Sequence, residues 1–221
     1  MTYQFDYGSV LEYWPRFVEG MWSTIWISAV SMALAVTAGL AVYLMRVSEH
    51  GCLNRPAAAF VQIVRNTPFL VQIFFIFFGL PSIGLSITPI AGALLALTIN
   101  GAAYISEIFR GGFQSLGSGL AEASKALGLT RSQIFIYVLF KPGLRAIYPA
   151  LTSQFTLLLL TSSVVSSISA EELTSISQQI EMETYRSFEV FSLTALLYLV
   201  ISYLFALVFT VFQRRFLNYP I

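Results

Sequence analysis

The chain has 221 residues, of which 57% are hydrophobic and only 10% are charged, and its formal net charge is +1. Soluble domains carry about 25% charged residues, so this composition excludes an ordinary soluble protein and is typical of a membrane protein. The single cysteine, Cys52, excludes an internal disulfide. We expect no metal site, no bound cofactor and no nucleic-acid partner.

Long uncharged runs mark the membrane segments, and they extend over residues 20–45, 66–106, 146–170 and 190–213. A helix needs about 20 apolar residues to cross a bilayer, so the second run is too long for one helix. The prolines Pro81 and Pro89 interrupt it. Because the runs are continuous rather than alternating, they favour helices over barrel strands.

The predicted fold class is therefore an all-α integral membrane protein with about five transmembrane helices. A single transmembrane domain covers residues 1–221, and a loop over residues 111–144 separates the third span from the fourth. The spans are expected near residues 20–45, 57–79, 88–110, 145–168 and 190–213.

Basic residues indicate the orientation, because Lys and Arg favour the cytoplasmic side of a membrane. Outside the spans, only Arg16 and Arg186 lie in segments assigned to the other side. We therefore expect the N-terminus outside the cell, and the loop 111–144 and the C-terminus in the cytoplasm. The basic residues on the predicted cytoplasmic side are Arg46, Arg55, Arg110, Lys125, Arg131, Lys141, Arg145, Arg214 and Arg215.

The loop 111–144 carries a hydrophilic stretch, EASKALG, at residues 122–128. Its first six residues suit a helix, and Gly128 is placed to end that helix. Small side chains here permit the close approach of a partner. The residues assigned to such a contact are Glu122, Ala123, Ser124, Ala126 and Gly128.

Three further motifs accompany this stretch: VRNTPFLVQ at 64–72, AAYISEIFRGG at 102–112 and EELT at 171–174. With these four motifs in this order, the chain resembles the permeases of ABC-class importers for polar amino acids. In that family the EAA loop is a cytoplasmic helix and turn that docks on a separate ATPase. The resemblance covers nearly the whole chain.

The resemblance implies a multi-pass protein of the bacterial inner membrane that moves a polar amino acid inward by alternating access. Its implied partners are a cytoplasmic ATPase dimer, a second permease subunit, identical or related, and an extracytoplasmic solute-binding protein. The sequence itself has no GxxxxGK[ST] phosphate loop and no catalytic constellation, so we predict that the chain is not an enzyme. The alternative is an ion-coupled carrier or channel without an ATPase partner, although such a protein usually has acids within its spans.

Polar residues inside the spans are the candidates for a substrate path. Arg65 is able to pair with a substrate carboxylate, to pair with Glu107, or to extend toward the cytoplasmic surface. Asn100 offers an amide to a substrate or to a neighbouring helix. The hydroxyls of Thr161, Ser162 and Ser163 either face the path or bond to their own helix. The predicted substrate-binding residues are Arg65, Asn100, Thr161, Ser162 and Ser163.

The chain departs from the family pattern at two places that bear on these candidates. Many members have a Lys-Asp pair just before the two serines, whereas Leu160 and Thr161 stand here. The family also has Leu-Pro directly after a β-branched residue, whereas Pro142 comes one place later here, so we expect the start of the fourth span to shift by a residue. The acidic segment 169–189 is either a short amphipathic helix or a solvated loop.

Overall fold

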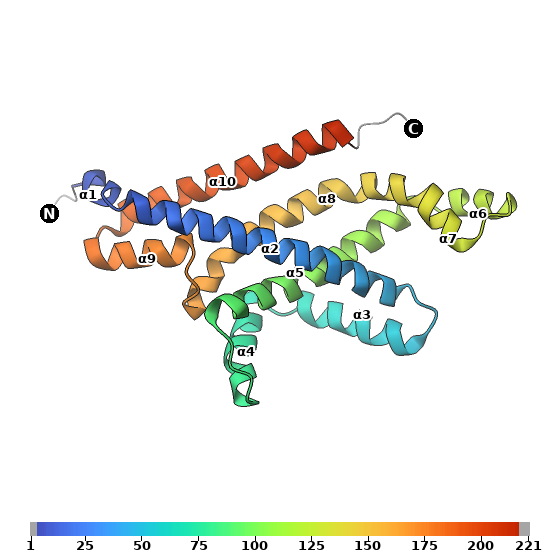
Figure 1. Ribbon diagram of the computed structural model, residues 1–221, viewed down its shortest axis with the longest axis horizontal. Coiled ribbons are helices and arrows are strands. Elements are labelled where there is room, and N and C mark those ends of the chain that lie inside the picture. The colour runs from blue at the N-terminus through green and yellow to red at the C-terminus, as the bar shows by residue number, and fades with distance from the viewer. Residues whose placement is uncertain (1–3, 217–221) are drawn as a thin grey trace.

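The computed structural model describes residues 4–216, and it is built from helices throughout this range. Figure 1 shows them as an elongated bundle, with α9 and the N-terminal helix at one end and α6 and α7 at the other. The elements are α1 (Tyr7–Leu11), α2 (Trp14–Arg46), α3 (Gly51–Arg65), α4 (Phe69–Ser82), α5 (Pro89–Gln114), α6 (Gly119–Ala126), α7 (Arg131–Gln133), η1 (Ile134–Leu139), α8 (Phe140–Thr161), η2 (Ser162–Ile168), α9 (Leu173–Thr184) and α10 (Ser187–Phe216).

Four stretches of the described residues are long and apolar enough to cross a membrane, namely Trp14–Arg46, Pro89–Gln114, Ile134–Ile168 and Ser187–Arg215. A fifth crossing is possible if α3 and α4 count as one span, although their axes are bent by 110°. The predicted fold class, an all-helical membrane protein with about five spans, is confirmed.

The bend between α3 and α4 divides the expected span 57–79 and has a local cause at Pro68. Proline lacks a backbone N–H, so the carbonyl four residues before it loses its helical partner. The side chain of Gln72 replaces that partner, because its Nε2 donates to the carbonyls of Val64 (2.7 Å) and Thr67 (2.8 Å). The Thr67 hydroxyl donates to the Ile63 carbonyl at 2.8 Å. These side-chain hydrogen bonds stabilise the break together with a backbone bond from the Thr67 N–H to the Val64 carbonyl, and α4 points away from the bundle (Figure 1).

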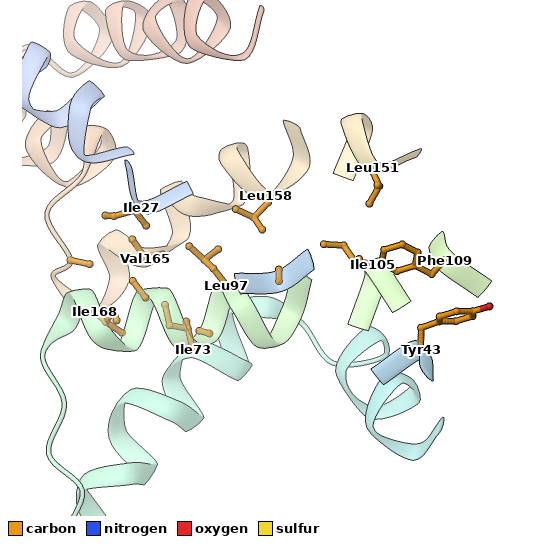
Figure 2. Packing of buried hydrophobic residues seen from close by; sticks show 14 of the residues in the cluster. Ile27, Tyr43, Ile73, Leu97, Ile105, Phe109, Leu151, Leu158, Val165 and Ile168 are labelled. Atoms are coloured by element: carbon orange, nitrogen blue, oxygen red, sulfur yellow. The ribbon is translucent and has the colours of Figure 1, made fainter. Parts of the chain in front are cut away.

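Small residues bring α2 and α5 into close contact at the centre of the bundle. An added Cβ at Gly39 would lie 2.8 Å from Ile105, and one at Gly101 would lie 2.8 Å from Ala35. Membrane helices associate through such small residues, because lipid supplies no hydrophobic drive. The core around this contact includes Leu97 and Leu158 and is drawn in Figure 2.

The end of the bundle near α6 is held by two reciprocal glycine contacts between α5 and α8. A Cβ at Gly112 would lie 1.9 Å from Ile147, and one at Gly143 would lie 2.3 Å from Phe113. Just before α8, the chain forms the π-helical segment η1, in which the Phe140 N–H donates to the Phe135 carbonyl.

Pro142 gives η1 a physical reason, because an α-helical proline clashes with the carbonyl four residues earlier and leaves it unbonded. The wider π turn relieves that conflict. The expected one-residue shift at the start of this span stays a prediction, and the structure has the π-helical segment η1 before Pro142.

Candidate substrate cavity and coupling helix

A cavity of about 440 Å³ opens at the break between α3 and α4 and faces α5 and α8. It brings together three of the predicted substrate-binding residues, Arg65, Asn100 and Thr161, which come from three separate helices. The remaining lining residues are Asn66, Thr67, Pro68, Phe69, Tyr104, Gln154 and Leu157. The lining therefore combines a guanidinium, neutral amides and hydroxyls with a few apolar side chains.

Arg65 carries the formal charge of this cavity. Its guanidinium lies 5.4 Å from the centre of the Tyr104 ring, within the range of a cation–π contact. Its Nη1 is 3.8 Å from Oε1 of Glu107, which is an ion pair too long for a hydrogen bond. The side chain is 41% exposed, so it retains donors that face the cavity.

Asn100 lies across the cavity on α5, and its orientation is fixed by the α3–α4 break. Its Nδ2 donates to Oε1 of Gln72 at 3.0 Å. The same Gln72 side chain donates hydrogen bonds to the Val64 and Thr67 carbonyls at the break. This bond fixes the orientation of the amide, whose oxygen and second N–H are the groups left for a ligand.

Ser162 and Ser163 are not among the residues that line this cavity. The Ser162 hydroxyl is buried and donates to the Leu159 carbonyl at 2.6 Å, and the Ser163 hydroxyl donates to the Leu160 carbonyl at 2.8 Å. Ser163 instead lines a shallow depression of about 580 Å³ beside α10, together with Tyr198. Both hydroxyls serve the tight helix η2, which is one of the two alternatives expected from the sequence.

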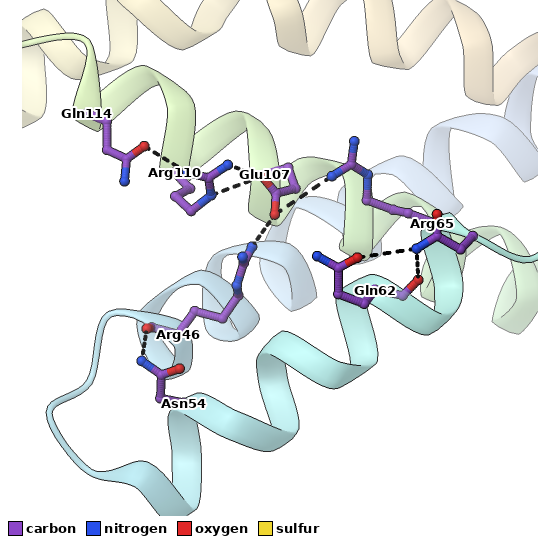
Figure 3. A network of polar contacts seen from close by, with 8 residues as sticks. Arg46, Asn54, Gln62, Arg65, Glu107, Arg110 and Gln114 are labelled. Carbon is purple, nitrogen blue, oxygen red and sulfur yellow. Dashed lines mark hydrogen bonds and ion pairs between the residues drawn. The ribbon is translucent and has the colours of Figure 1, made fainter.

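Beside the cavity, one carboxylate is shared by three arginines (Figure 3). Glu107 accepts from Arg46 Nη1 at 2.6 Å and from Arg110 at 2.6 Å and 3.0 Å, and Arg65 lies 3.8 Å away. Glu107 and Arg110 are three residues apart on α5, a spacing that places two side chains on one helix face. Arg46 was missed, because 61 residues separate it from Glu107 and no local pattern links them.

The predicted coupling residues lie on and just after α6. Glu122, Ala123, Ala126 and Gly128 are exposed, whereas Ser124 is buried and its hydroxyl donates to the Leu120 carbonyl. Leu127, directly before Gly128, is 81% exposed.

Gly128 ends α6 in a conformation that favours glycine, with φ at +78°. Its N–H donates to the Lys125 carbonyl, and the Leu129 N–H donates to the Ser124 carbonyl. This pair of bonds is a Schellman motif, and it sets the direction in which the chain leaves α6.

At the opposite end, the fully buried Glu172 is the N-cap of α9. Its carboxylate accepts from the Ser175 N–H (2.8 Å), the Tyr198 hydroxyl (2.5 Å) and the Thr24 hydroxyl (3.4 Å). Burial raises the pKa of Glu172, and these hydrogen bonds oppose the shift. The carboxylate thus ties α9 to both α2 and α10.

A bundle of apolar spans with a polar cavity at a broken helix, and a small exposed helix on the longest connection, defines the class of transport permeases. The family model for the binding-protein-dependent transport system inner membrane component matches residues 31–218. The chain belongs to this family, and it is therefore a multi-pass inner-membrane permease subunit of an ABC transporter, which is not itself catalytic. The predicted family is confirmed.

Relatives and solved structures agree with this assignment over nearly the whole chain. The glutamine transport system permease protein GlnP of Escherichia coli (strain K12) is 34% identical over 214 residues, which is 96% of this chain and 98% of the relative. The nopaline transport system permease protein NocM of Agrobacterium fabrum (strain C58) is 33% identical over 208 residues, with coverage of 90% and 86%. A chain in the crystal structure of an amino acid ABC transporter with histidines superimposes with a TM-score of 0.91 at 32% identity, covering 96% of this chain and 100% of that one.

Proposed function

We propose that this permease subunit carries a polar amino acid through the cavity at the α3–α4 break, by alternating access driven by ATP that a separate subunit hydrolyses. The observation that supports this is the meeting of Arg65, Asn100 and Thr161 in one cavity. An amino acid brings a carboxylate for the guanidinium and an ammonium for neutral oxygens. Relatives named for the transport of glutamine and nopaline support the substrate class.

The test is uptake of labelled amino acids by the assembled complex in proteoliposomes. Arg65→Gln and Thr161→Val should each lower uptake several-fold without loss of assembly. Arg55→Gln and Thr156→Val are matched controls, since they make the same chemical changes at positions that do not line the cavity. Wild-type uptake by both cavity variants would overturn the assignment of this cavity as the substrate site. Uptake that needs an ion gradient but no ATP would show that ATP is not the energy source.

The partners follow from the family at the level of an ABC transporter complex. We propose that α6 contacts one subunit of a cytoplasmic ATPase dimer through Glu122, Ala123, Ala126 and Gly128, with Ser124 in a supporting role beneath them. A second permease subunit and an extracytoplasmic solute-binding protein complete the assembly. The exposure of small side chains on α6 supports such a contact.

Gly128→Val and Ala123→Trp test this contact, because they alter the turn and the surface of α6. Both variants should uncouple ATP hydrolysis from uptake, while the protein still inserts into the membrane. Lys141→Ala, on α8 and outside the proposed contact, is the control. Normal uptake and normal stimulated hydrolysis in both variants would contradict the coupling role.

We propose that the α9 end is outside the cell and the α6 end is in the cytoplasm, within a single domain that covers residues 1–221. The placement of basic residues supports this orientation. A cysteine at Met182, which is 62% exposed, should react with an impermeant thiol reagent from outside in a Cys52→Ser background. A cysteine at the exposed Ser132 should react only after permeabilisation, and the reverse pattern would overturn the orientation.

A further inference from the structure

The charge of the cavity at the α3–α4 break is one-sided. Its ten lining residues include one guanidinium, that of Arg65, and no Asp or Glu. The polar groups opposite Arg65 are neutral, and they belong to Asn100, Gln154 and Thr161. Such a lining holds an anion directly, whereas it meets a cation only with neutral oxygens.

In the part of the chain that the structure describes, the carboxylate beside the cavity is already shared among several arginines. Glu107 is the acid beside Arg65, but it is already held at 2.6 Å by Arg46 and at 2.6 Å by Arg110. Three guanidinium groups thus share one carboxylate, which leaves a formal local charge of +2. The Arg65 and Arg110 side chains are 41% and 40% exposed, so water screens this excess in part, and the remaining field favours negative groups and opposes positive ones.

The α-carboxylate and the α-ammonium of an amino acid occupy the partners that the cavity offers. Its carboxylate takes the Arg65 guanidinium. Its ammonium takes neutral acceptors, such as the amide oxygen of Asn100. Methylene groups of the side chain fit against Phe69 and Leu157. A second ammonium or a guanidinium on the side chain would then have no counter-charge, and an unpaired charge in such a site is costly.

We infer that the cavity selects amino acids with uncharged or acidic side chains and discriminates against cationic ones. The inference rests on the proposed function, since it assumes that this cavity holds the substrate. It assigns the selection to charge rather than to size, because 440 Å³ accommodates an extended side chain of either kind.

The test is competition for labelled glutamine by the permease–ATPase complex in lipid nanodiscs, without the solute-binding protein, which would impose its own selection. Citrulline and arginine are the decisive pair, because they have nearly the same shape and differ in charge. Citrulline should compete at a concentration at least tenfold lower than arginine. Equal competition by the two would overturn the inference and leave the proposed function intact, whereas no binding of any amino acid would overturn both.

A second experiment tests whether an added carboxylate increases the preference for arginine. Thr161→Asp places a carboxylate in the cavity and should bring arginine to parity with citrulline or beyond. Thr161→Asn, which has the same shape without the charge, should keep the wild-type preference. Misfolding would weaken the binding of all ligands alike, so it would not change the citrulline-to-arginine ratio. An unchanged citrulline-to-arginine ratio in Thr161→Asp would contradict the charge-based selection.

Discussion

The two ends of the bundle each hold a buried or nearly buried carboxylate, and they stabilise it by opposite means. Near α6, the Glu107 side chain is 14% exposed and is surrounded by the guanidinium groups of Arg46, Arg110 and Arg65. Near α9, Glu172 is fully buried, and its hydrogen-bond donors are a tyrosine, a threonine and a backbone N–H. The first arrangement depends on charge, and the second depends on neutral hydrogen bonds and an elevated pKa.

This difference suits the two ends to different tasks. Charge pairs act over distance and tolerate small displacements of their helices, whereas short neutral hydrogen bonds fail once the geometry changes. We therefore expect the ion pairs near α6 to survive small shifts of their helices, and the hydrogen bonds of Glu172 to hold α9 in one position.

The largest effect is expected for Glu107→Gln. Removing the carboxylate leaves three arginines in mutual repulsion, and loss of one partner from such a buried network costs about 3 kcal/mol. The thermal unfolding midpoint in detergent should fall clearly and should recover in part at high salt, which screens the arginines. Glu122→Gln, at an exposed site, should leave the midpoint unchanged. Equal midpoints for the two variants would remove the distinction between the ends.

The next effect concerns the glycine contact between α5 and α8. Gly112→Ala places a methyl group 1.9 Å from a carbon of Ile147, and such overpacking costs about 2 kcal/mol. Gly111→Ala is a matched control, because a Cβ there meets nothing within 4 Å. The control should be neutral or slightly stabilising. Combining Gly112→Ala with Ile147→Ala should restore much of the loss, and the absence of any restoration would show that the contact is not the cause.

A smaller effect is expected at the α9 end for Tyr198→Phe. The variant removes the hydroxyl that donates to Glu172 and that also contacts Thr174 at 2.9 Å. The loss of one hydrogen bond to a buried carboxyl costs about 1–2 kcal/mol. Proteolysis of the segment around α9 should become faster. Tyr203→Phe, at a 66% exposed position, is the control, and equal protease resistance in both would argue against the proposed role of Glu172.

The smallest effect is the pH dependence that Glu172 confers. Its pKa is raised above the ordinary 4.5 by burial, so the folded protein binds this proton more tightly than the unfolded chain does. The resulting stability is fully present below about pH 4.5 and is lost as the pH rises through the elevated pKa. The difference in midpoint between wild type and Glu172→Gln should therefore change over this window. A constant difference from pH 4 to pH 8 would contradict the assignment.

The sequence predicted the features that depend on composition and on local spacing. Long apolar runs located the membrane helices, and the three-residue spacing of Glu107 and Arg110 is a local signal for the ion pair that they form. The amphipathic alternative for segment 169–189 was right, since α9 is a helix that buries Leu173 and Ile180. These signals are local, because each one depends on a handful of neighbouring residues.

Features that depend on distant contacts could not be predicted in the same way. The pairing of Arg46 with Glu107 and the burial of Ser124 follow from how helices pack. Ser162 and Ser163 were placed in the substrate path, and their role as such stays a prediction. The structure shows their hydroxyls bonded to their own helix. Hydroxyl residues carry no signal in sequence that separates these two uses.

The π-helical segment η1 (Ile134–Leu139) also has a consequence for chain length. Each residue added to an α-helix turns everything beyond it by about 100°. A π turn takes in about one residue more than an α turn, so it absorbs such an addition without that rotation. We therefore expect that deletion of one residue within η1 would return this turn to α geometry without rotating the exposed face of α6. At this point the length of the chain can change without a change in the direction of α6.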